Sequence, residues 1–211
     1  NLMKLFKILS SYKGFIFKLF YFETWYLIRS IKYREFSLSF DKPSLFEEYK
    51  DSVEYVPTPY YFLREALKFI DYSSGSIIDI GCGSGRALRY FKEYTKSHNI
   101  HEFIGIDLNT EVLDVGRKFN DEIKYINNDA TIYEFPQDTI LIYLFNPFGQ
   151  SSMSNFIDNL VSQKNKFKSK IRIIYVSPVH MDLFEKDFRL IFKNINEFNK
   201  GIAVFDMQLN S

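Results

Sequence analysis

The residues best suited to chemistry lie between Asp79 and Gly85, where the sequence is Asp-Ile-Gly-Cys-Gly-Ser-Gly. Three alternating glycines weaken a helix or a strand, so they indicate a loop that adopts positive φ angles or lies close to a ligand. Asp79 precedes the first of these glycines. Its carboxylate would repel a phosphate and attract a cation. The stretch therefore predicts a loop that binds a ligand with a positively charged end.

The spacing of the glycines distinguishes between several kinds of nucleotide-binding loop. A P-loop has a lysine and then a serine or threonine after its last glycine, whereas Arg86 and Ala87 follow here. A dinucleotide-binding loop has the spacing Gly-x-Gly-x-x-Gly, whereas the sixth position of this loop is Arg86. We therefore favour a ligand without a phosphate at the loop, and keep a nucleotide-dependent oxidoreductase as the alternative enzyme.

Two further acidic residues follow apolar segments that are typical of strands. The carboxylate of Asp107 could accept hydrogen bonds from both hydroxyls of a ribose; its alternative role, a helix N-cap, fits Asn109 or Thr110 better. Asp129 could accept a hydrogen bond from the amine of a purine while the Ala130 N–H donates to the ring, unless Asp129 is an ordinary turn residue. Together with Asp79, these residues describe a nucleoside with an amino-acid tail, such as S-adenosylmethionine.

The sheet that would position these residues is indicated by apolar segments that alternate with amphipathic ones. We expect strands at residues 76–80, 101–107, 123–127, 139–145 and 171–176. We expect helices at residues 60–70, 86–95, 110–119 and 151–166, with residues 73–75 ending the first, and an antiparallel pairing of segments 188–198 and 201–209. This alternation predicts an α/β fold with a doubly wound, mostly parallel seven-stranded sheet and an antiparallel C-terminal strand pair. The acidic residues would then meet at the carboxyl ends of the strands.

From about Tyr55 onward, the chain resembles the class I S-adenosylmethionine-dependent methyltransferases. Asp79–Gly85 matches their first motif, Gly105–Asp107 matches the acidic end of their second strand, and Asn128–Ala130 matches their adenine-contacting turn. The resemblance implies a Rossmann-like fold and S-adenosyl-L-methionine as the cofactor. The expected cofactor-binding residues are Asp79, Gly81, Cys82, Gly83, Gly85, Asp107, Leu108, Asp129, Ala130, Asn146 and Tyr60. Cys82 is the single cysteine of the chain, and we expect it to be a packing residue of the loop.

Asn146, Pro147 and Phe148 follow the predicted fourth strand. They are similar to a shortened form of the Asn-Pro-Pro-aromatic motif of amino methyltransferases. This resemblance implies that the Asn146 side chain and the prolyl carbonyl accept hydrogen bonds from the target amine, while Phe148 packs against it; the alternative is a turn that ends the strand. With the Tyr-x-x-Pro sequence Tyr175–Pro178, the motif also resembles a group of small bacterial methyltransferases. We expect transfer to nitrogen rather than oxygen, on a small molecule, a protein side chain or a sugar.

His180 is the one histidine at the carboxyl end of a predicted strand. Histidine is the usual side chain for proton transfer near neutral pH, so this residue is a candidate base; the alternative is a loop or helix-start residue. The predicted catalytic residues are therefore Asn146, Pro147, Phe148 and His180. The histidines and the cysteine have no zinc-site spacing. A non-catalytic protein that binds S-adenosylmethionine remains an alternative.

The first 36 residues differ from the rest of the chain. They contain seven basic and two acidic residues and therefore have a net charge of +5. The whole chain has a net charge of only +1, and this near balance argues against a dedicated nucleic-acid binder. Their apolar residues have helical spacing, with a predicted break at Gly14. The segment is either a helical extension packed on the domain or on a second subunit, or a basic amphipathic helix on an anionic membrane.

The predicted domains are a helical extension at residues 1–40 and a methyltransferase domain at residues 41–211, with the boundary in the acidic, proline-containing segment 41–59. Lysines and other charges interrupt every early apolar run, so we expect neither a secretory signal nor a transmembrane helix. We therefore expect a cytoplasmic protein, with peripheral contact to the inner membrane face as the further option.

Overall fold

The computed structural model describes residues 10–28, 31, 57–70, 73–96 and 99–207. Its strands are β1 (Gly75–Ile80), β2 (Ile100–Asp107), β3 (Lys124–Asn127), β4 (Thr139–Phe145), β5 (Arg172–Val176), β6 (Phe188–Ile195) and β7 (Gly201–Met207). Its helices are α2 (Ile16–Trp25), α4 (Tyr60–Leu67), α5 (Arg86–Tyr94), α6 (Thr110–Phe119) and α7 (Gln150–Ser162), with short 3-10 helices η1 (Lys164–Lys166) and η2 (Met181–Phe184). The strands and helices predicted from residue 60 onward are all present.

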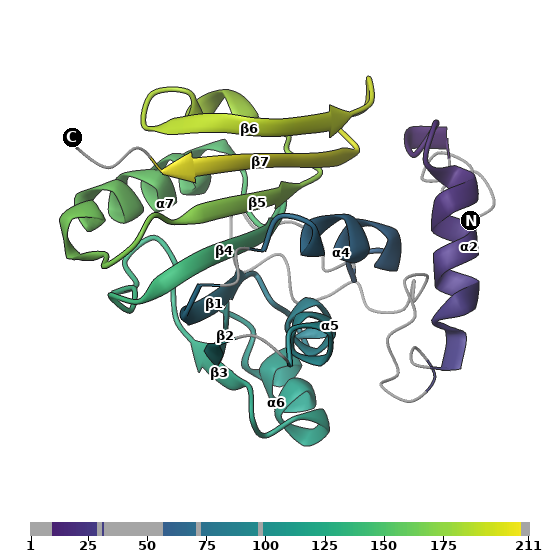
Figure 1. Ribbon diagram of the computed structural model, residues 1–211, viewed down its shortest axis with the longest axis horizontal. Coiled ribbons are helices and arrows are strands. Elements are labelled where there is room, and N and C mark those ends of the chain that lie inside the picture. Colours follow the sequence, from purple (N-terminus) through teal and green to yellow (C-terminus); the bar gives the residue numbers. More distant parts are fainter. Residues whose placement is uncertain (1–9, 29–30, 32–56, 71–72, 97–98, 208–211) are drawn as a thin grey trace.

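The seven strands form one sheet with the order β3-β2-β1-β4-β5-β7-β6 (Figure 1). Strands β1 to β5 run parallel to one another, and β7 runs antiparallel between β5 and β6. The predicted doubly wound sheet with an antiparallel C-terminal pair is therefore confirmed. Its strand order reverses between β1 and β4, which both carry predicted site residues at their carboxyl ends.

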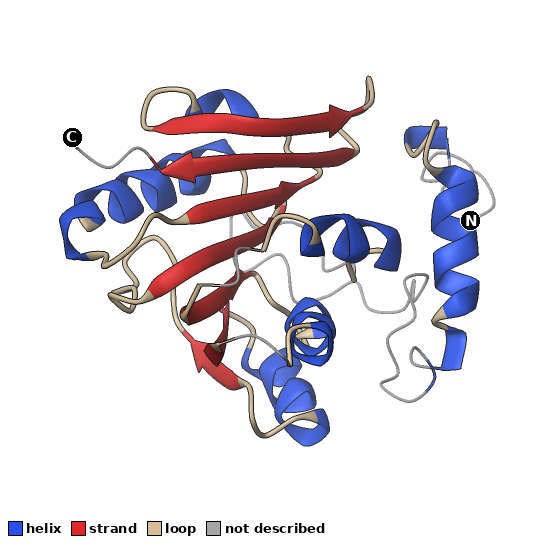
Figure 2. Cartoon of the chain, viewed as in Figure 1, coloured by secondary structure: helices blue, strands red, loops and turns tan. Residues whose placement is uncertain are grey.

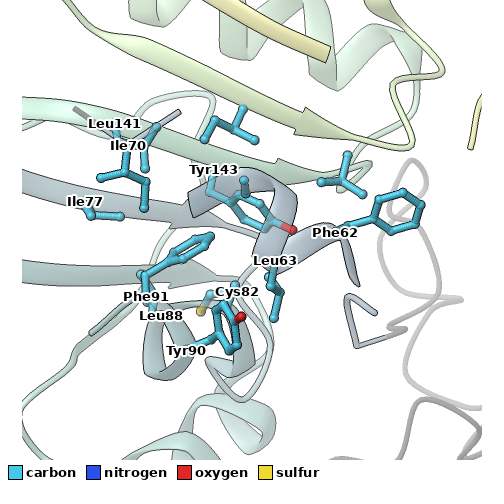
Figure 3. Packing of buried hydrophobic residues seen from close by; sticks show 14 of the residues in the cluster. Phe62, Leu63, Ile70, Ile77, Cys82, Leu88, Tyr90, Phe91, Leu141 and Tyr143 are labelled. Carbon is cyan, nitrogen blue, oxygen red and sulfur yellow. The ribbon is translucent and has the colours of Figure 1, made fainter. Parts of the chain in front are cut away.

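Helices cover both faces of the sheet (Figure 2). Leu141 and Tyr143 of β4 belong to the core layer under α4 and α5, whereas Ile142 and Leu144 belong to the layer under α7. Because both faces are covered, β4 is apolar along its whole length. Figure 3 shows the first layer, in which the Tyr143 ring lies 5.2 Å from the Phe91 ring of α5, measured between centroids.

Two predicted element boundaries were wrong. Helix α4 ends at Leu67, before the predicted turn at residues 73–75, and Gly75 is instead the first residue of β1. A Cβ atom at Gly75 would lie 2.4 Å from the carbonyl oxygen of Asp138, so the glycine permits a close backbone approach. The helix predicted at residues 151–166 is divided into α7 and η1.

Helix α2 lies beside α4 at the edge of the molecule (Figure 1). Gly14 adopts a φ of +90° just before the helix begins, as the predicted break requires. The Asn196 side chain donates hydrogen bonds to the carbonyls of Ser11 and Lys13, both at 2.9 Å, which anchors the start of this segment. The predicted domain boundary at residue 40 lies outside the described residues. Among the helices that are described, the longest has 13 residues, which is too short to span a bilayer.

Candidate functional site

Both predicted motifs lie at the point where the strand order reverses. The glycine loop follows β1, and the Asn146–Phe148 turn follows the neighbouring β4. In open α/β sheets, ligands bind beyond the carboxyl ends of the strands at such a point. The topology therefore brings the predicted cofactor loop and the predicted acceptor turn together.

Gly81 and Pro147 form the direct contact between the two motifs. Gly81 has a φ of +70°, and a Cβ atom there would lie 2.7 Å from the Cβ of Pro147. Side chains rarely adopt this backbone region, and the space they would need is occupied by the proline ring. A glycine is therefore required at the first position of the loop for both reasons.

The first amides of the glycine loop are bound to the end of β2. The N–H groups of Gly81 and Cys82 both donate to the Ile106 carbonyl, at 2.9 and 3.1 Å. The Gly83 N–H donates to Oδ2 of Asp107 at 2.8 Å. Loops that bind phosphate present free N–H groups to the ligand. Because three successive amides already have partners, this part of the loop does not form a phosphate cradle.

Asp107 is half-buried, and its carboxylate also accepts a hydrogen bond from the Asn109 N–H at 2.9 Å. Asn109, in turn, caps α6 by accepting from the Val112 N–H, so it is Asn109, of the two cap residues considered in the sequence, that has this role. Burial raises the pKa of Asp107, and the hydrogen bonds from Asn109 and Gly83 partly oppose this rise. Each carboxylate oxygen can accept more than one hydrogen bond. Asp107 therefore organises the loop and keeps capacity for ligand hydroxyls.

Asp79, at the carboxyl end of β1, is only 3% exposed. Burial raises its pKa well above the usual value, and the negative charge of Asp107 raises it further. Tyr143 is its partner in the register with β4 and donates a hydrogen bond to Oγ1 of Thr58 at 3.3 Å. Burial and the charge of Asp79 both raise the pKa of Tyr143, so its hydroxyl stays protonated. A cation bound next to Asp79 would stabilise the charged carboxylate.

Asp129 and Ala130 follow β3, as predicted. The Asp129 side chain accepts a hydrogen bond from the Thr131 N–H at 2.8 Å, which gives it the turn role considered in the sequence. Ala130 is buried, and its carbonyl accepts from the Asn159 side chain at 3.1 Å. The turn is thus well ordered by its own hydrogen bonds, and adenine contact remains a prediction.

Two predicted catalytic positions, Asn146 and His180, adjoin a tyrosine that sequence reasoning did not select. The Tyr175 hydroxyl donates to Oδ1 of Asn146 at 2.9 Å, and Asn146 has a φ of +41°. The backbone N–H of His180 donates to the same tyrosine oxygen at 3.5 Å. His180 begins η2, the alternative role considered for it. Phe148 packs against Phe156 of α7, with ring centroids 5.8 Å apart.

Tyr175 is fully buried in the layer under α7, yet it ends in a hydroxyl. A tyrosine within an otherwise apolar strand indicates a hydrogen bond in the core. Tyr175 is the tyrosine of the Tyr-x-x-Pro sequence, so its type was visible in the sequence. Its hydrogen-bond partner, Asn146, is 29 residues away, and only the pairing of β4 with β5 brings the two side chains together.

The half-buried Glu23 forms a cluster with the buried Tyr60 and Arg86 next to the end of the glycine loop. Glu23 accepts from the Tyr60 N–H at 2.8 Å and, through its other oxygen, from the Arg86 guanidinium at 2.9 Å. The guanidinium carbon lies 3.9 Å from the centroid of the Tyr60 ring. Tyr60 is therefore completely buried and packs against the Arg86 guanidinium, whereas we expected it to line the cofactor. Neither Glu23 nor Arg86 was predicted to contribute to the site.

Cys82 is a free, buried thiol whose pKa is raised by burial. A Cβ atom at Gly105 would lie 2.6 Å from its sulfur, so the thiol fills the space above β2. In the part of the chain that the structure describes, no three histidine, cysteine or acidic side chains are grouped as metal ligands.

Residues 77–163 match a family model described as a methyltransferase domain. The comparison with curated proteins gave no match. Among solved structures, the PH0226 protein from Pyrococcus horikoshii OT3 is similar to this chain with a TM-score of 0.54 at 13% identity, over 83% of this chain and 98% of that one. A TehB-like SAM-dependent methyltransferase from Corynebacterium glutamicum gives a TM-score of 0.50 at 17% identity, over 69% and 86% of the two chains.

The pyocyanin biosynthetic protein PhzM is also similar, with a TM-score of 0.54 at 13% identity over 70% of this chain. This chain covers 54% of PhzM, so it corresponds to about half of that protein. These likenesses establish the fold. The sequence match over residues 77–163 identifies the part of the chain that resembles a methyltransferase domain, and supports S-adenosyl-L-methionine as the cofactor.

Proposed function

We propose that the protein is an S-adenosylmethionine-dependent methyltransferase that transfers a methyl group to a nitrogen atom of its acceptor. One observation carries the proposal beyond the methyltransferase-domain match: the acidic pair Asp79 and Asp107 flanks a loop whose first amides are bound to β2. This arrangement suits a ligand with a ribose and a cationic tail. It is unfavourable for the pyrophosphate of a dinucleotide.

The residues present fit such a ligand. Asp79 is a buried carboxylate whose pKa is raised by burial and by the charge of Asp107, so its charged form would be stabilised by the ammonium group of a methionine tail. Asp107 would accept from the ribose hydroxyls through the lone pairs that Gly83 and Asn109 do not use. In this proposal Asp129 and Ala130 bind the adenine ring.

The bound cofactor would supply a methyl group carried on a sulfonium, and the chain's own residues would align the acceptor with it. Asn146 and the carbonyl of Pro147 would accept hydrogen bonds from the acceptor amine. Tyr175 fixes the orientation of the Asn146 amide through its hydrogen bond to Oδ1. Good alignment of two reactants contributes roughly 7–11 kcal/mol to lowering a barrier.

Transfer to nitrogen is favoured by the presence of two hydrogen-bond acceptors at the turn after β4. An amine can donate two hydrogen bonds, and a hydroxyl only one. The acceptor must also lose a proton, and His180 is the residue that we propose as its base. Small molecules, protein side chains and amino sugars can all carry such an amine.

Titration calorimetry with S-adenosylmethionine, its demethylated product and NAD tests the cofactor. We expect both sulfur compounds to bind and NAD not to bind; binding of NAD alone would instead favour the oxidoreductase. Transfer of label from methyl-labelled S-adenosylmethionine into a cell extract then tests catalysis, and the Asn146→Ala variant should lose this transfer. Tight binding without any transfer would favour a non-catalytic binding protein.

A further inference from the structure

The outward side of α2 is a largely apolar surface that also contains the exposed Thr24. Phe20 and Tyr21 lie three and four residues after Phe17, and Trp25 lies four residues after Tyr21, which places these side chains on one side of the helix. Ile28 follows three residues after Trp25, just beyond the end of α2. Phe17, Trp25 and Ile28 are 88%, 70% and 84% exposed. We refer to these five residues as the outer face of α2. Figure 1 shows α2 at the periphery of the molecule, beyond α4.

This surface is concentrated in one place. Of the 14 large hydrophobic side chains that are exposed in the described residues, seven lie between residues 17 and 31. Scattered apolar residues are normal on a protein surface, whereas a contiguous apolar patch indicates an interaction site. The rings of Tyr21 and Trp25 stack with centroids 6.1 Å apart, and with Phe20 they line a shallow hollow.

The charged side chains of α2 do not interrupt the outer face. Lys18 lies over the Tyr61 ring at 5.3 Å and reaches its hydroxyl at 3.4 Å. Glu23 is bound to the Tyr60 N–H and to Arg86. Lys18 and Glu23 are the only charged residues between Ile16 and Trp25, so the outer face is uncharged.

The opposite side of the segment is held in place on the domain. The Phe15 ring packs against Phe62, the Phe22 ring stacks on Tyr61, and the Tyr26 ring stacks on Tyr60, with centroids 5.4, 5.9 and 4.6 Å apart. Rotation of α2 to bury its outer face would remove all these contacts. The outer face therefore needs an occupant other than the α4 surface.

We propose that the outer face of α2 docks the protein onto an anionic lipid bilayer. The first 36 residues have a net charge of +5, and the rest of the chain carries −4 of the total of +1. Basic residues near an anionic leaflet contribute about 1 kcal/mol each to binding. Helices that lie in the membrane interface combine such charge with exposed aromatic and aliphatic side chains, and Trp and Tyr favour that depth.

A second copy of the chain is the less favourable occupant. A twofold interface through α2 would place the same surface of both copies against each other. It would therefore bring two segments of charge +5 close together, and their repulsion would oppose association. Lipid headgroups of negative charge instead complement this segment.

Trp25 is the only tryptophan of the chain and lies within the outer face, so its fluorescence reports docking directly. We expect a blue shift when vesicles of phosphatidylcholine and phosphatidylglycerol are added to the full chain. Affinity for these vesicles should exceed that for phosphatidylcholine alone by about tenfold or more, and should fall in about 0.5 M salt because exposed charges are screened.

A matched pair of variants separates docking from stability. Phe17→Asp places a charge in the outer face, within the first turn of α2 where an acid favours the helix. Val115→Asp makes the same kind of change at an exposed position of α6. We expect Phe17→Asp to lose vesicle affinity by at least about tenfold, with an unchanged melting temperature, and Val115→Asp to bind as the wild type does.

Two results would overturn the proposal. One is equal binding of the wild type and Phe17→Asp, and the other is a blue shift that grows with protein concentration in the absence of lipid, together with a dimer in sedimentation. The second result would assign the outer face to a second copy. Neither measurement depends on methyl transfer, so the docking proposal and the proposed enzyme activity can fail separately.

Discussion

Gly81 and Pro147 are in contact at the carboxyl ends of β1 and β4, because a missing side chain on the first glycine leaves room for the proline ring. This contact holds the loop proposed to bind the cofactor next to the turn proposed to bind the acceptor. A change at Gly81 affects both parts of the site.

Gly81→Ala should lower the free energy of unfolding. Its left-handed backbone costs an alanine about 1–2 kcal/mol, and the new Cβ would overlap Pro147, which costs about 1–3 kcal/mol more. Gly14→Ala is the matched control, because Gly14 also has a positive φ but has no atom within 4 Å of the added Cβ. Chemical denaturation of both variants measures the difference. Equal losses would mean that Pro147 moves away freely.

Asp107→Asn should weaken the binding of S-adenosylmethionine by roughly 10–100-fold, because hydrogen bonds to a charged group contribute about 1.5–3 kcal/mol. The remaining amide oxygen can accept from only some of the partners that Asp107 now serves. Calorimetry measures the affinity. The control is Asp114→Asn, because Asp114 forms an exposed ion pair with Arg117 within α6. Wild-type affinity in the Asp107 variant would exclude the ribose role.

Asp79 should make the ligand-free protein less stable at neutral pH than in mild acid. Burial raises the pKa of Asp79 well above its usual value. Between that usual value, about 4, and the raised value, the folded protein holds a proton that the unfolded chain has lost. The free energy of unfolding therefore falls as the pH rises through this window.

Asp79→Asn should reduce this pH dependence, which will not vanish because the pKa of Asp107 is also raised by burial. Thermal unfolding between about pH 4 and about pH 8 measures the slope. At neutral pH the variant should melt higher, by about 2–4 °C for each kcal/mol recovered, and yet bind S-adenosylmethionine more weakly. If the stability of the variant fell more steeply with rising pH than that of the wild type, the raised pKa of Asp79 would be contradicted.

Tyr175→Phe removes the hydrogen bond to Asn146 and leaves the buried ring in place. If Tyr175 positions Asn146 for the acceptor, kcat should fall about tenfold while the KM for S-adenosylmethionine stays the same; tenfold corresponds to about 1.4 kcal/mol. Steady-state kinetics with the acceptor identified by label transfer separates the two constants. A loss of stability with unchanged kcat would reduce Tyr175 to a core residue.

Glu23→Gln should loosen α2 from the domain. It removes the charge that pairs with Arg86, which is 2% exposed, and keeps an oxygen for the Tyr60 N–H. Hydrogen bonds to charged groups of this kind contribute about 1.5–3 kcal/mol, and faster proteolysis near Lys18 should accompany the loss. Glu134→Gln, which disrupts an exposed pair with Lys166, should change stability by at most about 1 kcal/mol. Similar proteolysis of the two variants would show that Glu23 does not hold the helix.

Local pattern determined much of this protein before any tertiary contact was known. The period of the apolar residues and the turn residues between them predicted the strands and helices from residue 60 onward, and the residues at the carboxyl ends of the strands were identified as well. Gly75 was misassigned because a glycine in a turn and a glycine under a neighbouring backbone look alike in sequence. The Asp138 carbonyl that requires it is 63 positions away.

Only the tertiary structure decided which groups share the site. The Tyr175–Asn146 hydrogen bond, the use of the loop amides by β2, and the Glu23–Arg86 pair all join residues that are distant along the chain. Periodicity reports which side of an element is buried, but not which element buries it. For the same reason the sequence showed that the first segment is apolar and basic, while the structure alone showed which of its side chains face α4 and which remain exposed.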